Sequence, residues 1–147
     1  MPIMTSSMDE RGRCLINVVI GFPDLARSER ERAGQAIPAE VVATAMIDTG
    51  CSHTVVARRV MARTGLVPSS CRLLATVAGT ISLVAVPTYR AKLCLSHEDR
   101  RMALCQDLEI SETPDGIEDH DVLLGMDVLA NCFFAFNGPE GYFTLAY

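Results

Sequence analysis

The residues with the clearest chemical potential lie together at positions 48–53, which read Asp-Thr-Gly-Cys-Ser-His. A mostly apolar run, residues 42–47, leads directly into Asp48. Carboxylates are rarely placed beside apolar strand residues unless a partner neutralises them or a reaction uses them. Two chemistries fit these residue types. They are acid–base catalysis by the Asp48 carboxylate, and nucleophilic attack by the Cys51 thiol with His53 as its base.

The thiol alternative depends on spacing alone. Cys51 and His53 are two residues apart, so in an extended segment their side chains point the same way. No acid that would orient the imidazole can be identified, and a surface polar residue is the simpler interpretation of His53. The sequence therefore favours acid–base catalysis by Asp48 over the thiol mechanism.

Two later segments strengthen the case for Asp48. Residues 122–124 are an apolar strand that runs into Gly125 and then into a helical turn. Between this strand and Asp48 lie two predicted strands joined by a turn of small residues, Ala78, Gly79 and Thr80. With the Asp-Thr-Gly sequence at 48–50, this order of segments resembles the single-motif, retroviral-type (retropepsin-like) aspartic proteases. Cys51 departs from the family, which usually has Ala or Ser there.

The resemblance implies an all-β fold, a closed or partly open β-barrel with one or two short helices and a β-hairpin flap. It implies a role for each residue of the motif. Asp48 is the catalytic acid, Thr49 bonds the opposing loop, and Gly50 presents its N–H to the carboxylate. Ser52 is expected to bond the outer oxygen of Asp48.

Peptide hydrolysis without a metal, serine or cysteine needs one group that takes a proton from water and another that gives one. Two carboxylates held together do both, because like charges at close range share one proton. The chain has one Asp-Thr-Gly motif, so the dyad requires Asp48 from two chains, and C2 symmetry supplies them. We therefore expect a homodimeric aspartic endopeptidase with no cofactor and no metal.

Two other readings of the motif stay open. Asp48 could merely cap a turn, since Asp before Thr-Gly is a common turn arrangement. The domain could also be a catalytically silent dimeric binding or scaffolding module, because a fold survives loss of activity. The presence of Asp, Thr and Gly together argues against a pure scaffold.

The expected substrate is an extended peptide or protein segment, bound through main-chain hydrogen bonds. Side-chain pockets are expected to be apolar. The predicted substrate-binding residues are Ser52, Val55, Val77, Ala78, Gly79, Thr80, Ile81 and Val84.

The remaining sequence sets the elements around this site. Alternation and turn residues predict strands at 15–22, 40–47, 55–56, 73–77, 81–86, 89–95, 102–110, 122–124, 132–136 and 142–147, with a short helix at 57–64. Pro87 is expected to bend a strand or to place it at an edge. Residues 1–13 read as a flexible leader and 14–147 as a single domain. Residues 24–38 read as a surface insertion, either a short exposed helix or a mobile loop.

Composition excludes several classes of protein. The 147 residues are 49% hydrophobic and carry a net charge of -5, with no basic cluster that would indicate nucleic-acid binding. No apolar run approaches the roughly 18 residues of a membrane span, so no membrane partner and a cytoplasmic location are expected. The six cysteines lack zinc-site spacing and read as structural thiols.

Overall fold

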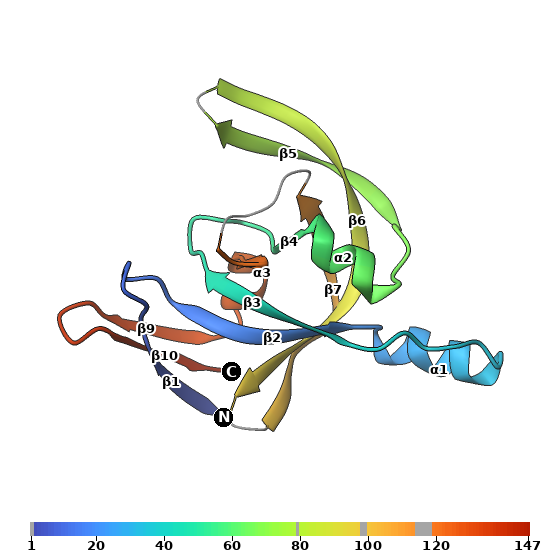
Figure 1. Ribbon diagram of the computed structural model, residues 1–147, viewed down its shortest axis with the longest axis horizontal. Helices are drawn as coiled ribbons and strands as arrows, with labels where there is room; N and C mark the ends of the chain where they lie inside the picture. The colour runs from blue at the N-terminus through green and yellow to red at the C-terminus, as the bar shows by residue number, and fades with distance from the viewer. Residues whose placement is uncertain (1, 79, 98–99, 114–118) are drawn as a thin grey trace.

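The computed structural model describes residues 2–78, 80–97, 100–113 and 119–147, and it leaves the side chains at 76–82 and 100 undescribed. Within these residues the chain forms ten strands and three short helices (Figure 1). They are β1 (Ile3–Ser7), β2 (Leu15–Gly21), α1 (Asp24–Arg32), β3 (Val41–Ile47), β4 (Val55–Ala57), α2 (Arg58–Thr64), β5 (Ser70–Ala78), β6 (Thr80–His97), β7 (Arg100–Thr113), β8 (Val122–Leu124), α3 (Met126–Leu129), β9 (Phe133–Asn137) and β10 (Tyr142–Ala146).

Six strands close a barrel. They follow the order β2-β3-β8-β4-β7-β6, and the additional pairing of β2 with β6 completes the ring. β5 lies beyond β6 as an outer strand of the same sheet. The barrel is filled by branched aliphatic side chains, which pack well on the inner face of twisted strands. Its most deeply buried members include Val18, Ile20, Val56, Leu93, Leu95, Ile110, Val122 and Leu124. The expected all-β barrel with few short helices is confirmed.

A second, three-stranded sheet joins the two ends of the chain, in the order β1-β10-β9. We call it the terminal sheet. Ile3 pairs with Ala146 and Ser7 with Tyr142, and the N–H of Tyr147 donates to the carbonyl oxygen of Pro2. The prediction of a flexible leader is therefore wrong for residues 3–7, and the domain starts earlier than residue 14. The last strand, β10, pairs with β9 along one edge and with β1 along the other.

The predicted surface insertion contains a helix, α1, which points away from the barrel (Figure 1). None of its side chains is fully buried, and Leu25 is 70% exposed. Of the two conformations expected for this segment, residues 24–32 adopt the exposed helix.

β6 is a single 18-residue strand where two strands were predicted, so Pro87 does not interrupt it. Pro87 pairs with Cys71 on β5, while the pairing of β6 with β7 begins one residue later, at Thr88. β6 thus has a neighbour on one side only at this residue. A proline, which has no N–H to donate, is tolerated at such a position.

A buried carboxylate anchors β6 to the rest of the barrel. Glu112 is 7% exposed, and it accepts hydrogen bonds of 2.7 Å from both the Tyr89 hydroxyl and Arg58 Nε. Burial and the neighbouring Glu112 together raise the pKa of Tyr89 to about 12. The phenol therefore stays protonated and keeps donating over the whole neutral range.

Other candidate features are absent from the described part of the chain. It contains no helix that is long and apolar enough to cross a bilayer, and no group of three or more potential metal ligands. All six cysteines are free.

Candidate active site

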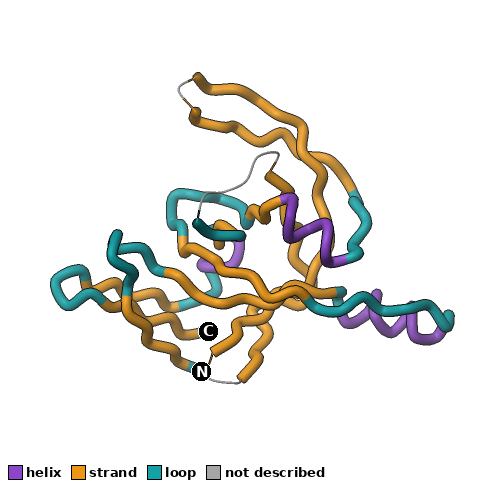
Figure 2. Tube along the Cα trace, in the orientation of Figure 1, coloured by secondary structure: helices purple, strands orange, loops and turns teal. Residues whose placement is uncertain are grey.

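Asp48 begins the loop that connects β3 to β4, which we call the Asp48 loop (residues 48–54; teal in Figure 2). Its N–H donates to the carbonyl oxygen of Leu124 on β8 at 3.1 Å, so the end of β3 is fixed to its neighbour. The N–H of Gly50 donates to Asp48 Oδ1 at 2.9 Å, as the sequence led us to expect. A Cβ at Gly50 would lie 3.2 Å from that oxygen, which makes glycine the residue that fits this approach.

The other expected contacts of the motif differ in outcome. Thr49 is exposed, and its expected partner belongs to the loop of a second chain, so its role stays a prediction. Ser52 is also exposed, and among the described residues its hydroxyl makes no hydrogen bond to Asp48. The carboxylate is instead held by the backbone of Gly50.

Asp127 accepts hydrogen bonds from the last residue of the Asp48 loop, a role that the sequence did not reveal. Its two carboxylate oxygens accept from the N–H of Thr54 at 2.8 Å and from the Thr54 hydroxyl at 2.7 Å. That hydroxyl, which is fully buried, in turn accepts from the N–H of Gly125 at 3.1 Å. An acid in the first turn of a helix has a sufficient local explanation. The one sequence feature that set Asp127 apart is its position two residues after Gly125.

Gly125 brings β8 and α3 against the back of the Asp48 loop. A Cβ at this residue would lie 2.6 Å from the carbonyl carbon of His53 and 3.0 Å from the carbonyl oxygen of Cys51. That same oxygen of Cys51 accepts from the N–H of Met126 at 2.8 Å. The expectation that an apolar strand plus glycine packs behind the loop is therefore met by backbone contacts.

A cavity of about 540 Å³ lies between the Asp48 loop and the β5–β6 hairpin, and we call it the central cleft. Its lining comprises Gly50, Cys51, Ser52, His53, Val55, Arg72, Leu73, Leu74, Ala75, Thr113 and Leu123. Ser52 and Val55 were predicted here, whereas Val84 lies outside the lining and pairs with Leu74. Gly79 and the side chains of Val77, Ala78, Thr80 and Ile81 fall outside the described residues.

The thiol in the central cleft is poorly suited to attack. Cys51 Sγ donates to the carbonyl oxygen of His53 at 2.9 Å, which is a backbone contact and not a contact with the imidazole. Burial raises the pKa of Cys51. Since the thiolate is the nucleophile, a raised pKa works against the thiol mechanism.

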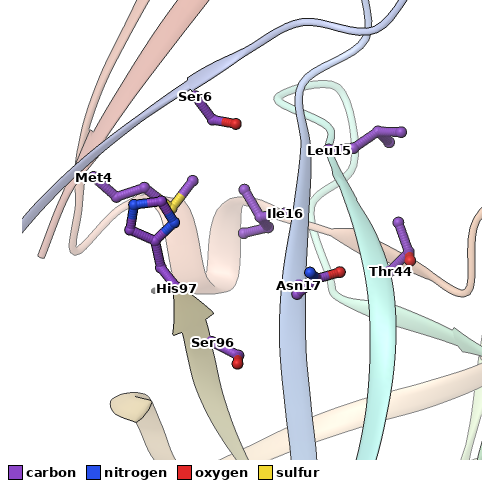
Figure 3. A pocket seen from close by; sticks show the side chains of 8 residues that line it. All are labelled: Met4, Ser6, Leu15, Ile16, Asn17, Thr44, Ser96 and His97. Carbon is purple, nitrogen blue, oxygen red and sulfur yellow. The ribbon is translucent and has the colours of Figure 1, made fainter. Parts of the chain in front are cut away.

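A smaller cavity of about 130 Å³ lies between the terminal sheet and the barrel (Figure 3). Its lining consists of Met4, Ser6, Leu15, Ile16, Asn17, Thr44, Ser96 and His97. Among the described residues, neither cavity is lined by a carboxylate. The central cleft is the one next to Asp48, because Gly50, Cys51, Ser52 and His53 of the Asp48 loop line it.

Comparison with known proteins agrees with this geometry. A family model described as aspartyl protease matches residues 37–128, which include the Asp48 loop, Gly125 and Asp127. The chain is similar to a crystal structure of a retropepsin-like aspartic protease from Rickettsia conorii, with 14% identity and a TM-score of 0.63, over 99% of this chain and 91% of that one. The EIAV protease in complex with the inhibitor HBY-793 also matches, with 14% identity and a TM-score of 0.45 over 86% of this chain and 93% of that one.

No curated protein matches the sequence. The Rickettsia structure establishes a shared fold, and the family model covers more than half of the chain. The protein has a retropepsin-like fold and belongs to the aspartyl protease family.

Proposed function

We propose that the protein is an aspartic endopeptidase that works as a homodimer, with Asp48 of each copy forming the catalytic dyad. The observation that carries this proposal is the Asp48 loop itself. It holds one carboxylate oxygen on the N–H of Gly50, next to residues that line a cleft of about 540 Å³. A carboxylate that only capped a turn would not need a second layer of hydrogen bonds from Thr54 and Asp127 behind it.

The chemistry follows from two carboxylates in one place. Like charges at close range do not both ionise, so the pair holds one proton. The ionised carboxylate takes a proton from water as the water oxygen attacks the peptide carbon. The protonated one gives its proton to the carbonyl oxygen. The tetrahedral intermediate then expels its amine, which takes the proton held by the dyad, while one hydroxyl of the intermediate returns its proton to the dyad and becomes the carbonyl of the product acid.

An extended peptide suits the shape of the central cleft. β5 pairs with β6 alone among the described strands, so its other edge can add a strand through main-chain hydrogen bonds. Val55, Leu74 and Leu123 supply apolar surface in the cleft. The β5–β6 hairpin is proposed as the flap, with Ala78, Gly79 and Thr80 at its tip. Ser52, Val77, Ile81 and Val84 stay predicted substrate contacts.

Stoichiometry and the terminal sheet support the proposed dimer. The chain has one Asp-Thr-Gly sequence, so a dyad needs two chains. β1, β9 and β10 contain no Asp, Glu, Lys or Arg, and they expose Ile3, Phe133 and Tyr142 by 40–68%. An uncharged sheet with the open edges β1 and β9 can meet its own copy without like-charge repulsion.

The decisive variant is Asp48→Asn, which keeps the shape of the side chain and removes the base for water. We expect proteolysis to fall at least about a thousandfold while the fold and the dimer persist. Asp24→Asn is the matched control, because Asp24 is an exposed acid on α1 that pairs with Lys92.

Mixing Asp48→Asn chains into the wild type tests the dyad separately. A mixed dimer keeps one competent carboxylate, so activity should fall faster than the wild-type fraction. Loss in simple proportion would argue for an active monomer. An inert wild type that still binds peptide would favour the silent binding module.

A further inference from the structure

Arg72 is the one formal charge among the described residues that line the central cleft, with histidine counted as neutral. It lies near the start of β5. Strand alternation places its side chain on the same face as that of Leu74, while Leu73 is 64% exposed on the other face. Arg72 precedes the last residue of β5 by six positions, which is on the order of 20 Å along an extended strand. The guanidinium therefore lies well back from the hairpin tip.

The guanidinium of Arg72 is held at one end. Its Nη2 forms an ion pair with Glu109 on β7. Its Nη1 is buried and has no hydrogen-bond partner among the residues that the structure describes. An unsatisfied buried donor is costly, and more so on a charged group. Arg72 therefore has binding capacity that the described part of the chain leaves unused.

The neighbouring acids do not supply this capacity. Glu109 already pairs with Arg72, and Asp107 pairs with Arg90 on the adjoining strand. The two cations and two anions of this cluster balance, so the missing partner need not cancel a net charge. It must instead offer acceptor oxygens in the plane of the guanidinium. A carboxylate offers two oxygens in the geometry of the guanidinium fork, whereas an amide offers one.

We propose that Arg72 makes the central cleft select peptides that carry a carboxylate, placed at a subsite away from the bond to be cut. The methylene groups of such a residue lie beside Leu74, and its carboxylate meets Nη1 of Arg72. The carboxylate comes from an Asp or Glu side chain or from the C-terminus of the peptide. This inference rests on the proposed function only in that the cleft must bind a peptide.

Binding to the Asp48→Asn protein tests the inference without catalysis. The probes are fluorescein-labelled decapeptides in pairs that differ by Glu or Gln at one position, each with a free or an amidated C-terminus. At one position we expect the Glu peptide to bind about tenfold or more tightly, as a charge-assisted hydrogen bond allows. If amidation alone removes the tight binding, the recognised group is the terminal carboxylate.

Variants assign the preference to Arg72. Arg72→Gln should reduce the Glu-to-Gln ratio to about one. Arg90→Gln should leave it unchanged, because Arg90 belongs to the same cluster and lies outside the central cleft. Exchanging the ion pair, as Arg72→Glu with Glu109→Arg, keeps the pair and reverses the charge facing the cleft. This double variant should bind a peptide with Lys at the selective position more tightly than the peptide with Glu there.

Three results would overturn the inference. They are equal binding of Glu and Gln peptides at every position, a preference that survives Arg72→Gln, and a double variant that folds yet keeps the preference for Glu. Failure of the proposed function gives a different pattern, in which the Asp48→Asn protein shows the Glu preference and the wild type cleaves none of the peptides.

Discussion

The Asp48 loop and the β5–β6 hairpin face the same cleft but are held in opposite ways. The loop is fixed by backbone atoms of Leu124 and Gly125 and by the half-buried carboxylate of Asp127. In the hairpin, β5 pairs with β6 alone among the described strands. Leu73 on β5 is 64% exposed and Leu83 on β6 is 67% exposed. The Asp48 loop is thus held by more partners than β5, a difference expected if the hairpin acts as the proposed flap and opens at low cost.

The largest expected effect comes from Gly125→Ala, which changes the backbone contact behind the Asp48 loop. The new Cβ would lie 2.6 Å from a backbone carbon of His53, and backbone cannot move aside as a side-chain end can. We expect a loss of about 3 kcal/mol in the free energy of unfolding, measured by urea denaturation.

Gly138→Ala is the matched control for this collision. A Cβ there meets the ring of Phe136 at 3.1 Å, and the ring can turn away. It should cost less than about 1 kcal/mol. Similar losses of stability in the two variants would show that the backbone contact behind the Asp48 loop costs no more to disturb than a contact with a side-chain ring.

Asp127→Ala comes next, because it leaves two donors of the buried Thr54 without an acceptor. We expect a loss of about 2–3 kcal/mol in the free energy of unfolding, together with lower activity from a misplaced Asp48. Thr54→Ser keeps the hydroxyl and should retain most of both. If Asp127→Ala unfolded like the wild type, the loop would owe its position to the barrel alone.

A pH titration probes the anchor at the base of the hairpin. The folded pKa of Tyr89, about 12, lies above its ordinary value of 10.0. The stabilisation from the protonated phenol is therefore complete below pH 10 and is lost as the pH rises towards 12. This loss amounts to at most about 2–3 kcal/mol. The stability difference between wild type and Tyr89→Phe should shrink between pH 9 and pH 11.5, and a difference that stays constant over this range would contradict the role given to Tyr89.

The smallest effect on the free energy of unfolding should come from a change in the β5–β6 hairpin. Leu73→Ser on β5 should change the free energy of unfolding by less than about 0.5 kcal/mol, because its side chain is mostly in water already. Leu124→Ala on β8 should cost more, about 2–3 kcal/mol, since Leu124 is fully buried. Amide exchange should also be faster in β5 than in β8, and equal rates in the two strands would contradict the contrast drawn here.

Local patterns were enough to predict most elements of the barrel. The strand before Asp48, the helix α2 and the strand before Gly125 all lie within one residue of their expected bounds. Each is a short local pattern with a nearby glycine or proline. Gly50 and Asp48 were identified for the same reason, since their hydrogen bond spans two residues.

What the sequence did not reveal depends on distant partners. β1 is a short segment of Ile, Met, Thr and Ser, and its strand character comes from β10, at the other end of the chain. Asp127 and Thr54 are 73 positions apart, and Arg72 and Glu109 are 37 apart. Each residue has an adequate local explanation, so only the folded chain shows its second role.

The exposed helix α1 makes the chain divisible. A nine-residue helix with no buried side chain has little stability of its own, and it offers arginines at 27, 30 and 32. Trypsin should therefore cut there first. The two strands on either side of the cut are joined by six residue pairs of their own, from Leu15–Met46 to Ile20–Val41, and β2 also pairs with β6. The two fragments should stay together as a complementing pair with the barrel and the Asp48 loop intact.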